Sequence, residues 1–219
     1  QLTGEWQSLK LLERIQVSPT SSVLRFQLPN PKEPLNLSTC ACILARAKSM
    51  DGDDYVIRPY TPISTNLHSG YFDLLVKDYG PEAQMSHTLT SRMKVGDTME
   101  FQHSDGNVKI QAPFSGYKHV LMMAGGTGIT PMIQALHAIL GEEPTQKVTL
   151  LYGSKTESDI LAKTLLDRWA VEHSNQFHVE YILSEEPEGS SWKGPRGYIT
   201  QEKVQDTLKE HSIQDTLCF

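Results

Sequence analysis

Up to about residue 110, apolar and polar residues alternate in short runs that end at turn residues. Residues 23–28, 71–76 and 98–101 follow this period of two, which is typical of strands with one buried face. Several such strands close together predict an antiparallel sandwich or barrel. One short helix, at about residues 85–93, is expected to interrupt them.

After about residue 116 the pattern changes to strand, turn and helix in repeated order. Buried strands are predicted at residues 119–124, 147–152 and 177–183, and a fourth begins at residues 216–219. Helices are predicted at residues 131–140, 156–169 and 200–209. The second of these opens on Thr156-Glu157-Ser158-Asp159, which resembles a capping box. Strands and helices in alternation predict a parallel sheet with crossover helices, so we expect two domains that divide after residue 113.

Composition narrows the class of protein. Of the 219 residues, 38% are hydrophobic and 8% aromatic, as in a folded chain. Three cysteines are too few for a disulfide framework, which favours a reducing compartment. The longest uncharged stretch, residues 120–140, holds glycines and a proline among polar residues, so it does not predict a membrane span. No signal peptide opens the chain, and any anchor is expected to lie outside these residues.

Charge bears on the partners. The net charge of −6 argues against a nucleic-acid binder. Residues 1–110 carry 11 Lys and Arg against 12 Asp and Glu, whereas residues 111–219 carry 9 against 14. The first half therefore repels an acidic protein partner less than the second half does.

A glycine-rich turn follows the buried strand at residues 119–124. Its sequence is Gly125-Gly126-Thr127-Gly128-Ile129-Thr130-Pro131, with Pro131 expected at the first helical position. Glycines let a ligand approach the backbone, and a helix N-terminus offers N–H groups to a phosphate. The turn lacks the Lys of a P-loop, so it predicts anion binding without nucleoside-triphosphate hydrolysis. A tight turn that binds nothing is the alternative.

A second motif, Arg58-Pro59-Tyr60-Thr61-Pro62, is held extended by its two prolines. Arg58 can bind a pyrophosphate through two hydrogen bonds, Tyr60 can stack on a planar ring and Thr61 can donate a hydrogen bond. The alternative is the end of a strand with a surface arginine.

Together these residues resemble a family. The motif at Arg58, the segments Lys77-Asp78-Tyr79 and Met85-Ser86, and the glycine turn occur in the order and spacing of NADH–cytochrome b5 reductases, flavoenzymes of the ferredoxin-reductase type. The resemblance implies an antiparallel Greek-key β-barrel FAD domain at residues 1–113, followed by an α/β parallel-sheet pyridine-nucleotide domain at residues 114–219. Residues 37–47 look more like the mitochondrial type of plants and algae than the animal enzyme.

The resemblance also implies roles for single residues. Arg58 binds the FAD pyrophosphate beside Pro59, Tyr60 packs on the isoalloxazine, and Thr61 hydrogen-bonds near flavin N5. Val76, Lys77 and Tyr79 line the flavin, with Lys77 also near the nicotinamide nucleotide, so Thr61 and Lys77 are the expected catalytic residues. Near the phosphates lie Gln84, Met85 and Ser86. The pyridine nucleotide is expected at Gly125, Gly126 and Thr127, where Pro131 follows and Thr130 reaches the flavin.

Departures from the family pattern qualify this reading. Cys40-Ala41-Cys42 replaces the usual Gly-Gln-His, which removes a histidine that could relay a proton. Two cysteines on one strand face with no further ligands favour packing over a metal or redox pair, so no metal is expected. Gln84 stands where the family has Lys, and residues 102–105 replace a Gly-Pro. The chain ends at Phe219, where the family places a Cys-Gly-Pro-Pro-like motif; without it, flavin binding is expected to survive and hydride transfer to be impaired.

The nucleotide preference follows from charge. Ser184, Glu185 and Glu186 end the third strand of the second half, where the adenosine ribose is read. A 2′-phosphate there would meet carboxylates and no arginine, which favours NADH over NADPH. An acidic surface loop without ligand contact is the alternative.

The implied reaction transfers a hydride from NADH to FAD, with the nicotinamide over the flavin between the domains, and then single electrons to a haem protein, with cytochrome b5 the expected acceptor. A monomer is expected, at the mitochondrial outer membrane or in the intermembrane space, or else on the cytoplasmic face of the endoplasmic reticulum. Membrane attachment would need an anchor beyond this chain. The alternatives are the reductase module of another electron-transfer system, such as a nitrate reductase or oxygenase, and a nucleotide-binding module without turnover.

Overall fold

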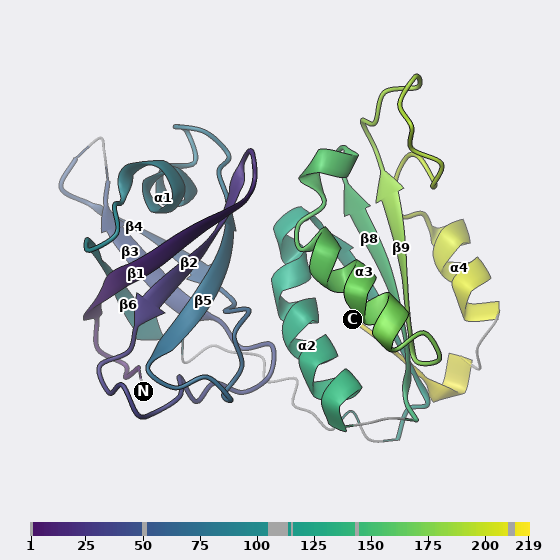
Figure 1. The fold of residues 1–219 in the computed structure, drawn as a ribbon, viewed down its shortest axis with the longest axis horizontal. Coiled ribbons are helices and arrows are strands. Elements are labelled where there is room, and N and C mark those ends of the chain that lie inside the picture. The colour runs from purple at the N-terminus through teal and green to yellow at the C-terminus, as the bar shows by residue number, and fades with distance from the viewer. Residues whose placement is uncertain (1, 50–51, 105–113, 115, 143–144, 210–212) are drawn as a thin grey trace. The chain divides into compact units, whose positions relative to one another are not determined.

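The computed structural model describes residues 2–49, 52–104, 114, 116–142, 145–209 and 213–219. Its backbone contacts divide the chain into two compact units, unit 1 (Gln1–Gln111) and unit 2 (Ala112–Phe219) (Figure 1). Unit 1 contains an antiparallel sheet and unit 2 a parallel sheet, which confirms the predicted fold class. The predicted boundary after residue 113 lies outside the described residues and stays a prediction.

The described part of unit 1 forms six strands and one short helix. The strands are β1 (Gln7–Ser18), β2 (Ser21–Gln27), β3 (Ile43–Lys48), β4 (Tyr55–Tyr60), β5 (Tyr71–Lys77) and β6 (Thr98–His103). They are ordered β4-β3-β6-β1-β2-β5 in one sheet. Strand β6 pairs with β1 and β3, both far from it in sequence, as in a Greek key. The helix α1 (Gln84–His87) continues into a π-helical turn at Thr88–Arg92, close to the helix predicted at residues 85–93.

Strand β1 has no clear period of two, and the sequence pattern did not predict it. Its pairing with β2 shifts register between Leu11 and Glu13 and again between Gln16 and Ser18. Each such bulge moves the side chains that follow to the opposite face of the sheet. The register shifts therefore interrupt both the ladder of hydrogen bonds and the apolar pattern of the strand.

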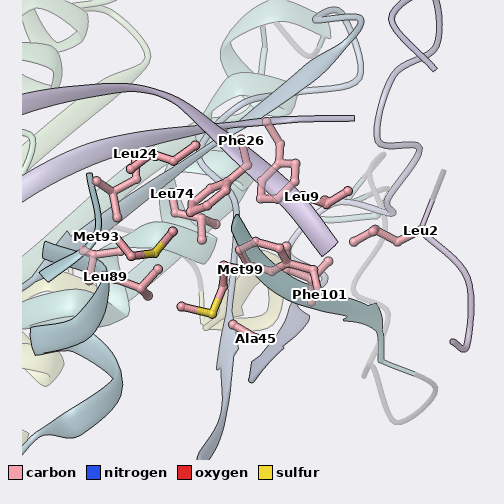
Figure 2. Close-up of a cluster of buried hydrophobic side chains, with 14 of the residues drawn as sticks. Leu2, Leu9, Leu24, Phe26, Ala45, Leu74, Leu89, Met93, Met99 and Phe101 are labelled. Carbon is pink, nitrogen blue, oxygen red and sulfur yellow. The ribbon is translucent and has the colours of Figure 1, made fainter. Parts of the chain in front are cut away.

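The core of unit 1 is built around three phenylalanines (Figure 2). The ring of Phe101 lies edge-on to Phe26, at 4.7 Å between centroids, and to Phe72, at 5.2 Å. All three side chains are fully buried. They come from β2, β5 and β6, so this one aromatic cluster joins strands from both ends of the unit's sequence.

In unit 2 the described residues form four strands, ordered β10-β7-β8-β9 and all parallel. The strands are β7 (His119–Gly125), β8 (Lys147–Ser154), β9 (Phe177–Leu183) and β10 (Thr216–Cys218). The helices are α2 (Ile129–Glu142), α3 (Lys163–Glu172) and α4 (Gln201–Lys209). All four predicted strands are confirmed, and so is the helix predicted at residues 200–209.

Helices cover both faces of the unit 2 sheet. Val204 and Leu208 of α4 pack on a cluster that includes Leu121 of β7. The neighbours of Leu121, Val120 and Met122, point to the other face and are also fully buried. Figure 1 shows α2 and α3 together on that side of the sheet, with α4 apart from them. A parallel sheet buried on both faces explains why its strands read as nearly continuous apolar runs.

The start predicted for the helix at residues 156–169 is wrong. Glu157–Asp159 form only a 3₁₀ turn, and α3 begins at Lys163. The Thr156 hydroxyl donates to the carboxylate of Asp159 at 2.8 Å instead of accepting from a backbone N–H. Ala162 then takes a left-handed conformation with φ of 55°, which separates the turn from the helix. The capping-box pattern is present, but its side chains bond each other.

Helix length bears on membrane crossing. Over the described ranges of the chain, no helix combines the length and the apolar character that a bilayer span requires.

Truncating the aromatic cluster should destabilise unit 1. Phe101→Ala removes a fully buried ring and leaves a cavity between Phe26 and Phe72, so we expect the free energy of unfolding to fall by about 3–5 kcal/mol. Chemical denaturation of the whole chain, with the unit 1 transition fitted separately, measures this. Leu67→Ala, at a side chain that is 93% exposed, is the control and should change it by less than about 0.5 kcal/mol. Equal effects of the two substitutions would contradict the assigned core.

Candidate functional site

The motif that begins at Arg58 lies on the end strand of the unit 1 sheet. Strand β4 pairs with β3, with Arg58 opposite Ala45 and Tyr60 opposite Ile43. A proline is tolerated on an edge strand because its missing N–H breaks no ladder hydrogen bond, which accounts for Pro59. The guanidinium of Arg58 is exposed and donates to the carbonyl of Ile57 at 2.8 Å.

Tyr60 differs from Arg58 in being half-buried against the core of unit 1. Burial raises the pKa of its phenol to about 12; the positive charge of Arg58 opposes this rise and the phenol of Tyr79 adds to it. Tyr60 is therefore neutral at physiological pH and offers an aromatic ring with a protonated hydroxyl. The interaction also shows that Tyr79, nineteen positions later in the chain, lies in the surroundings of β4.

The end of β5 and helix α1 supply the remaining unit 1 candidates. Val76 and Met85 are only 2% and 3% exposed, and their side chains belong to the core. Lys77 is the last residue of β5, with its ammonium 5.9 Å from the ring centroid of Tyr79. Helix α1, which contains Gln84, Met85 and Ser86, contacts β4, the strand that carries Arg58.

Side-chain hydrogen bonds hold α1 in this place. Gln84 accepts from the hydroxyl of Ser49 at 3.3 Å, and Ser86 donates to the carbonyl of Ala83 at 3.0 Å. The hydroxyl of Ser86, which the family resemblance assigns to a phosphate, is thus already bonded within its own turn. Thr61, the expected catalytic threonine, follows β4 directly and is half-buried.

These residues fit a flavin that carries a diphosphate. An exposed guanidinium beside a half-buried aromatic ring provides a charged donor for phosphate oxygens and a flat apolar surface for a ring. The sequence analysis predicted Arg58 and Tyr60 for this site, and the structure adds the contact between α1 and β4. It also adds a role for Asp78, which the family resemblance included without assigning it one: its carboxylate bonds α1 and the turn after it.

In unit 2 the glycine turn lies at the point where the strand order reverses. Strand β7 has β8 on one side and β10, the last strand in sequence, on the other. In open α/β sheets ligands bind at such a switch point, outside the carboxyl ends of the strands. The turn Gly126–Gly128 follows β7, and Gly126 has a φ of 51°, which favours glycine.

The start of α2 differs from the prediction. The helix begins at Ile129, so Pro131 is its third residue and not its first. A proline is tolerated there because the first four N–H groups of a helix have no intrahelical acceptor. The hydroxyl of Thr130 donates to the carbonyl of Thr127 at 3.2 Å and is buried, so in this structure it holds the turn.

The side chain of Tyr152 holds the glycine turn in place, and the sequence analysis did not predict this role. Its ring is fully buried in β8, its hydroxyl donates to the carbonyl of Gly126 at 2.8 Å, and the same oxygen accepts from the N–H of Leu161 at 3.3 Å. A tyrosine within a buried apolar strand was the available signal, since its hydroxyl must find a partner.

The turn fits a pyridine nucleotide. A Cβ added at Gly125 or Gly128 would meet no protein atom within 4 Å, so the protein's own packing does not require glycine at either position. A ligand that lies close to the backbone would require glycine at these positions. This open surface lies at the N-terminus of the 14-residue helix α2, where the helix dipole favours an anion, and it suits the phosphates of a dinucleotide.

The ends of β8 and β9 lie beside each other on the same edge of the sheet. The N–H of Glu185 donates to the carbonyl of Lys155 at 2.8 Å, and the two side chains form an ion pair at 3.0 Å. The hydrogen bond between the side chains of Lys155 and Glu185 raises the pKa of the Lys155 ammonium. Arg196 donates to the carbonyl of Glu186 and to the hydroxyl of Ser190. The expectation that no arginine lies near these glutamates is therefore wrong.

The Cys-Ala-Cys segment is also placed differently from the prediction. Cys40 lies in a turn with a φ of 65°, and β3 begins only at Ile43. The two cysteines therefore do not share a strand face, and Cys40 and Cys42 are both partly exposed.

Comparisons with known proteins agree with an FAD-binding unit 1 and an NAD-binding unit 2. A family model for an oxidoreductase FAD-binding domain matches residues 8–110, and one for an oxidoreductase NAD-binding domain matches residues 122–218. The chain is 40% identical over 213 residues to NADH-cytochrome b5 reductase 1 of Scheffersomyces stipitis, covering 97% of this chain and 72% of that protein. It is 36% identical over 218 residues to NADH-cytochrome b5 reductase 1 of Mycosarcoma maydis, covering 98% and 64%.

Among solved structures, the cytochrome b5 reductase domain of Ulva prolifera nitrate reductase superposes with a TM-score of 0.87 at 30% identity, over 99% of this chain and 87% of that one. The predicted resemblance, the FAD and NAD domains and their order along the chain are thereby confirmed. The chain belongs to the NADH–cytochrome b5 reductase family and is an oxidoreductase with an FAD-binding domain followed by an NAD-binding domain.

Proposed function

We propose that this chain takes a hydride from NADH onto FAD and passes the electrons singly to cytochrome b5 or a similar haem protein. The observation that carries the proposal is the presence, in one chain, of an edge strand with Arg58 and Tyr60 and of a glycine turn at a sheet switch point. Each feature suits one of the two cofactors, and electron transfer needs both.

In unit 1, Arg58 binds the FAD diphosphate and the ring of Tyr60 packs on the flavin. The guanidinium is exposed and accessible to a phosphate, whereas the phenol ring is half-buried and packs against the core. Lys77, Tyr79 and the backbone of Val76 line the flavin, and Gln84, Met85 and Ser86 lie near the phosphates. Gln84 is neutral, so Arg58 is the cation that we propose for the phosphates, with Lys77 beside the flavin.

Bound FAD supplies the redox chemistry, since it accepts a hydride and can release electrons one at a time. The chain's residues bind and orient the reactants, which lowers the barrier by proximity. Thr61 donates a hydrogen bond at the reacting edge of the flavin, and Lys77 contacts the nicotinamide nucleotide. In unit 2, the glycine turn and Thr127 hold the dinucleotide phosphates, with Thr130 and Pro131 shaping the start of α2.

The partner and compartment that we propose rest on the family resemblance. Unit 1, nearly neutral in net charge, is the more favourable surface for an acidic haem protein. We propose a monomer in the mitochondrion, with the cytoplasmic face of the endoplasmic reticulum as the alternative. Attachment to a membrane would be made by a segment beyond this chain.

A second candidate is the reductase module of a larger electron-transfer protein. The likeness to the reductase domain of a nitrate reductase, at 30% identity, favours it. The two functions differ in their acceptor and in what lies beyond this chain.

The acceptor is tested with a panel of haem proteins under NADH. We expect cytochrome b5 to be reduced at a rate at least about tenfold above that for myoglobin, because a specific docking surface orients the two proteins for electron transfer. Since the chain has a net charge of −6 and the partner is acidic, added salt screens their repulsion and should not lower this rate. Equal rates for all haem proteins would contradict the proposed partner.

Thr61 is tested by Thr61→Val, which keeps the shape of the side chain and removes its hydrogen bond. We expect reduction of bound FAD by NADH to slow by about 10- to 100-fold, the usual effect of losing one donor in a reacting site. FAD should stay bound, because the phosphate contacts are untouched. Stopped-flow absorbance measures the rate, with Thr65→Val as the matched control, and an unchanged rate would remove Thr61 from the chemistry.

Nucleotide preference is tested at Glu185. Wild-type protein should have a much higher kcat/KM for NADH than for NADPH, because a 2′-phosphate meets the carboxylate of Glu185. Glu185→Gln removes that charge and frees Lys155 from its ion pair, so kcat/KM for NADPH should rise by about tenfold. Glu188→Gln, on the same exposed loop, is the control. A wild-type preference for NADPH would overturn this assignment.

A further inference from the structure

One carboxylate in unit 1 accepts hydrogen bonds from two different segments. Asp78 follows β5 directly, and its Oδ1 accepts from the N–H of Gly80 at 2.8 Å. Its Oδ2 accepts from the hydroxyl of Ser91 at 2.5 Å and lies 3.1 Å from Nδ1 of His87. Gly80 belongs to Asp78's own loop, whereas His87 and Ser91 belong to α1 and its π-helical continuation.

The spacing of these donors follows from the helix. His87 and Ser91 are four residues apart, so they lie on one face of the turn and both point to the same acceptor. The turn is π-helical, with the N–H of Met93 bonded to the carbonyl of Thr88 at 2.9 Å. Such turns are rare and recur at functional sites.

The environment keeps Asp78 charged. The side chains of Asp78 and His87 are only 19% and 21% exposed. Burial alone would raise the pKa of Asp78, but hydrogen bonds from Ser91, Gly80, His87 and Thr90 outweigh it and hold the pKa below its ordinary value. A carboxylate accepting several such bonds in a shielded place is a firm link between the groups that donate them.

The link joins the two candidate FAD segments of unit 1. On one side, the N–H of Asp78 extends the β5 pairing by donating to the carbonyl of Thr20 at 2.7 Å, which fixes the neighbouring Lys77 and Tyr79 to the sheet. On the other side, His87 follows Met85 and Ser86 within α1.

The far end of this helix has its own anchor. Arg14 of β1 donates to the carbonyls of Leu89, Thr90 and Met93, which close the π-helical turn. Arg14 holds the end of the turn to β1, and the carboxylate of Asp78 holds its beginning to β5. The placement of Met85 and Ser86 relative to Lys77 therefore depends on Asp78.

We propose that Asp78 is a positioning residue for FAD: through His87 and Ser91 it fixes the phosphate-side segment at Met85 and Ser86 against the flavin-side segment at Lys77 and Tyr79. This inference rests on the proposed function. Asp78 itself does not touch the cofactor, since its carboxylate is taken up by protein donors.

The experiment compares FAD release with protein stability in the whole chain. Holoprotein is diluted, and the rise of FAD fluorescence gives the dissociation rate; the thermal midpoint without added FAD reports the fold. The variants are Asp78→Asn, the milder Ser91→Ala, and Asp73→Asn as the matched control. Asp73 is a shielded carboxylate on β5, the strand that Asp78 follows, but its partner is Arg25 at 2.8 Å, outside both FAD segments.

We expect Asp78→Asn to release FAD at least about tenfold faster and Ser91→Ala about threefold faster, in line with the loss of charge-assisted and single hydrogen bonds. Asp73→Asn should change the rate by less than about twofold even where its thermal midpoint falls as far. Equal release rates for Asp78→Asn and Asp73→Asn, or rates that follow the thermal midpoint across all three variants, would overturn the inference. Wild-type protein that binds no FAD would overturn the proposed function, and this inference with it.

Discussion

The binding of two anionic cofactors by a chain with a net charge of −6 depends on a few fixed donors. Overall charge repels a dinucleotide, so attraction must be local and must be held in place by the fold. In unit 1 the donor that we propose is the guanidinium of Arg58 on the edge of a sheet. In unit 2 we propose that the glycine turn binds the anion at the N-terminus of α2, where the helix dipole favours negative charge.

The two units hold their donors by different means. In unit 2 the order of the strands positions the glycine turn at the switch point of the sheet. The hydroxyl of Tyr152 holds the turn by donating a hydrogen bond to the carbonyl of Gly126. The described part of unit 1 offers no comparable backbone site, since α1 is a single turn. Its segments are joined through side chains instead, with Asp78 and Arg14 at the two ends of the same short helix.

Sequence analysis found what periodicity and local chemistry encode. Strands such as β9 were predicted to the residue, because a buried parallel strand reads as an apolar run between turn residues. Strand β1 was missed because its bulges break the period of two. In the predicted capping box at Thr156 the side chains hydrogen-bond each other and not the backbone, and the surrounding loop determines which of these bonds forms. The roles of Asp78 and Tyr152 were passed over because their partners are distant in sequence or on another element, and no local pattern reports them.

The most direct test of the account is the absorbance spectrum of the whole chain, incubated with FAD, freed of unbound cofactor and titrated with NADH without oxygen. We expect a bound flavin band in the visible range that bleaches as about one equivalent of NADH is added, because one hydride reduces one FAD. A colourless protein would contradict the assignment of unit 1, and a yellow protein that NADH leaves unchanged would contradict the assignment of the chain as an NADH-dependent reductase.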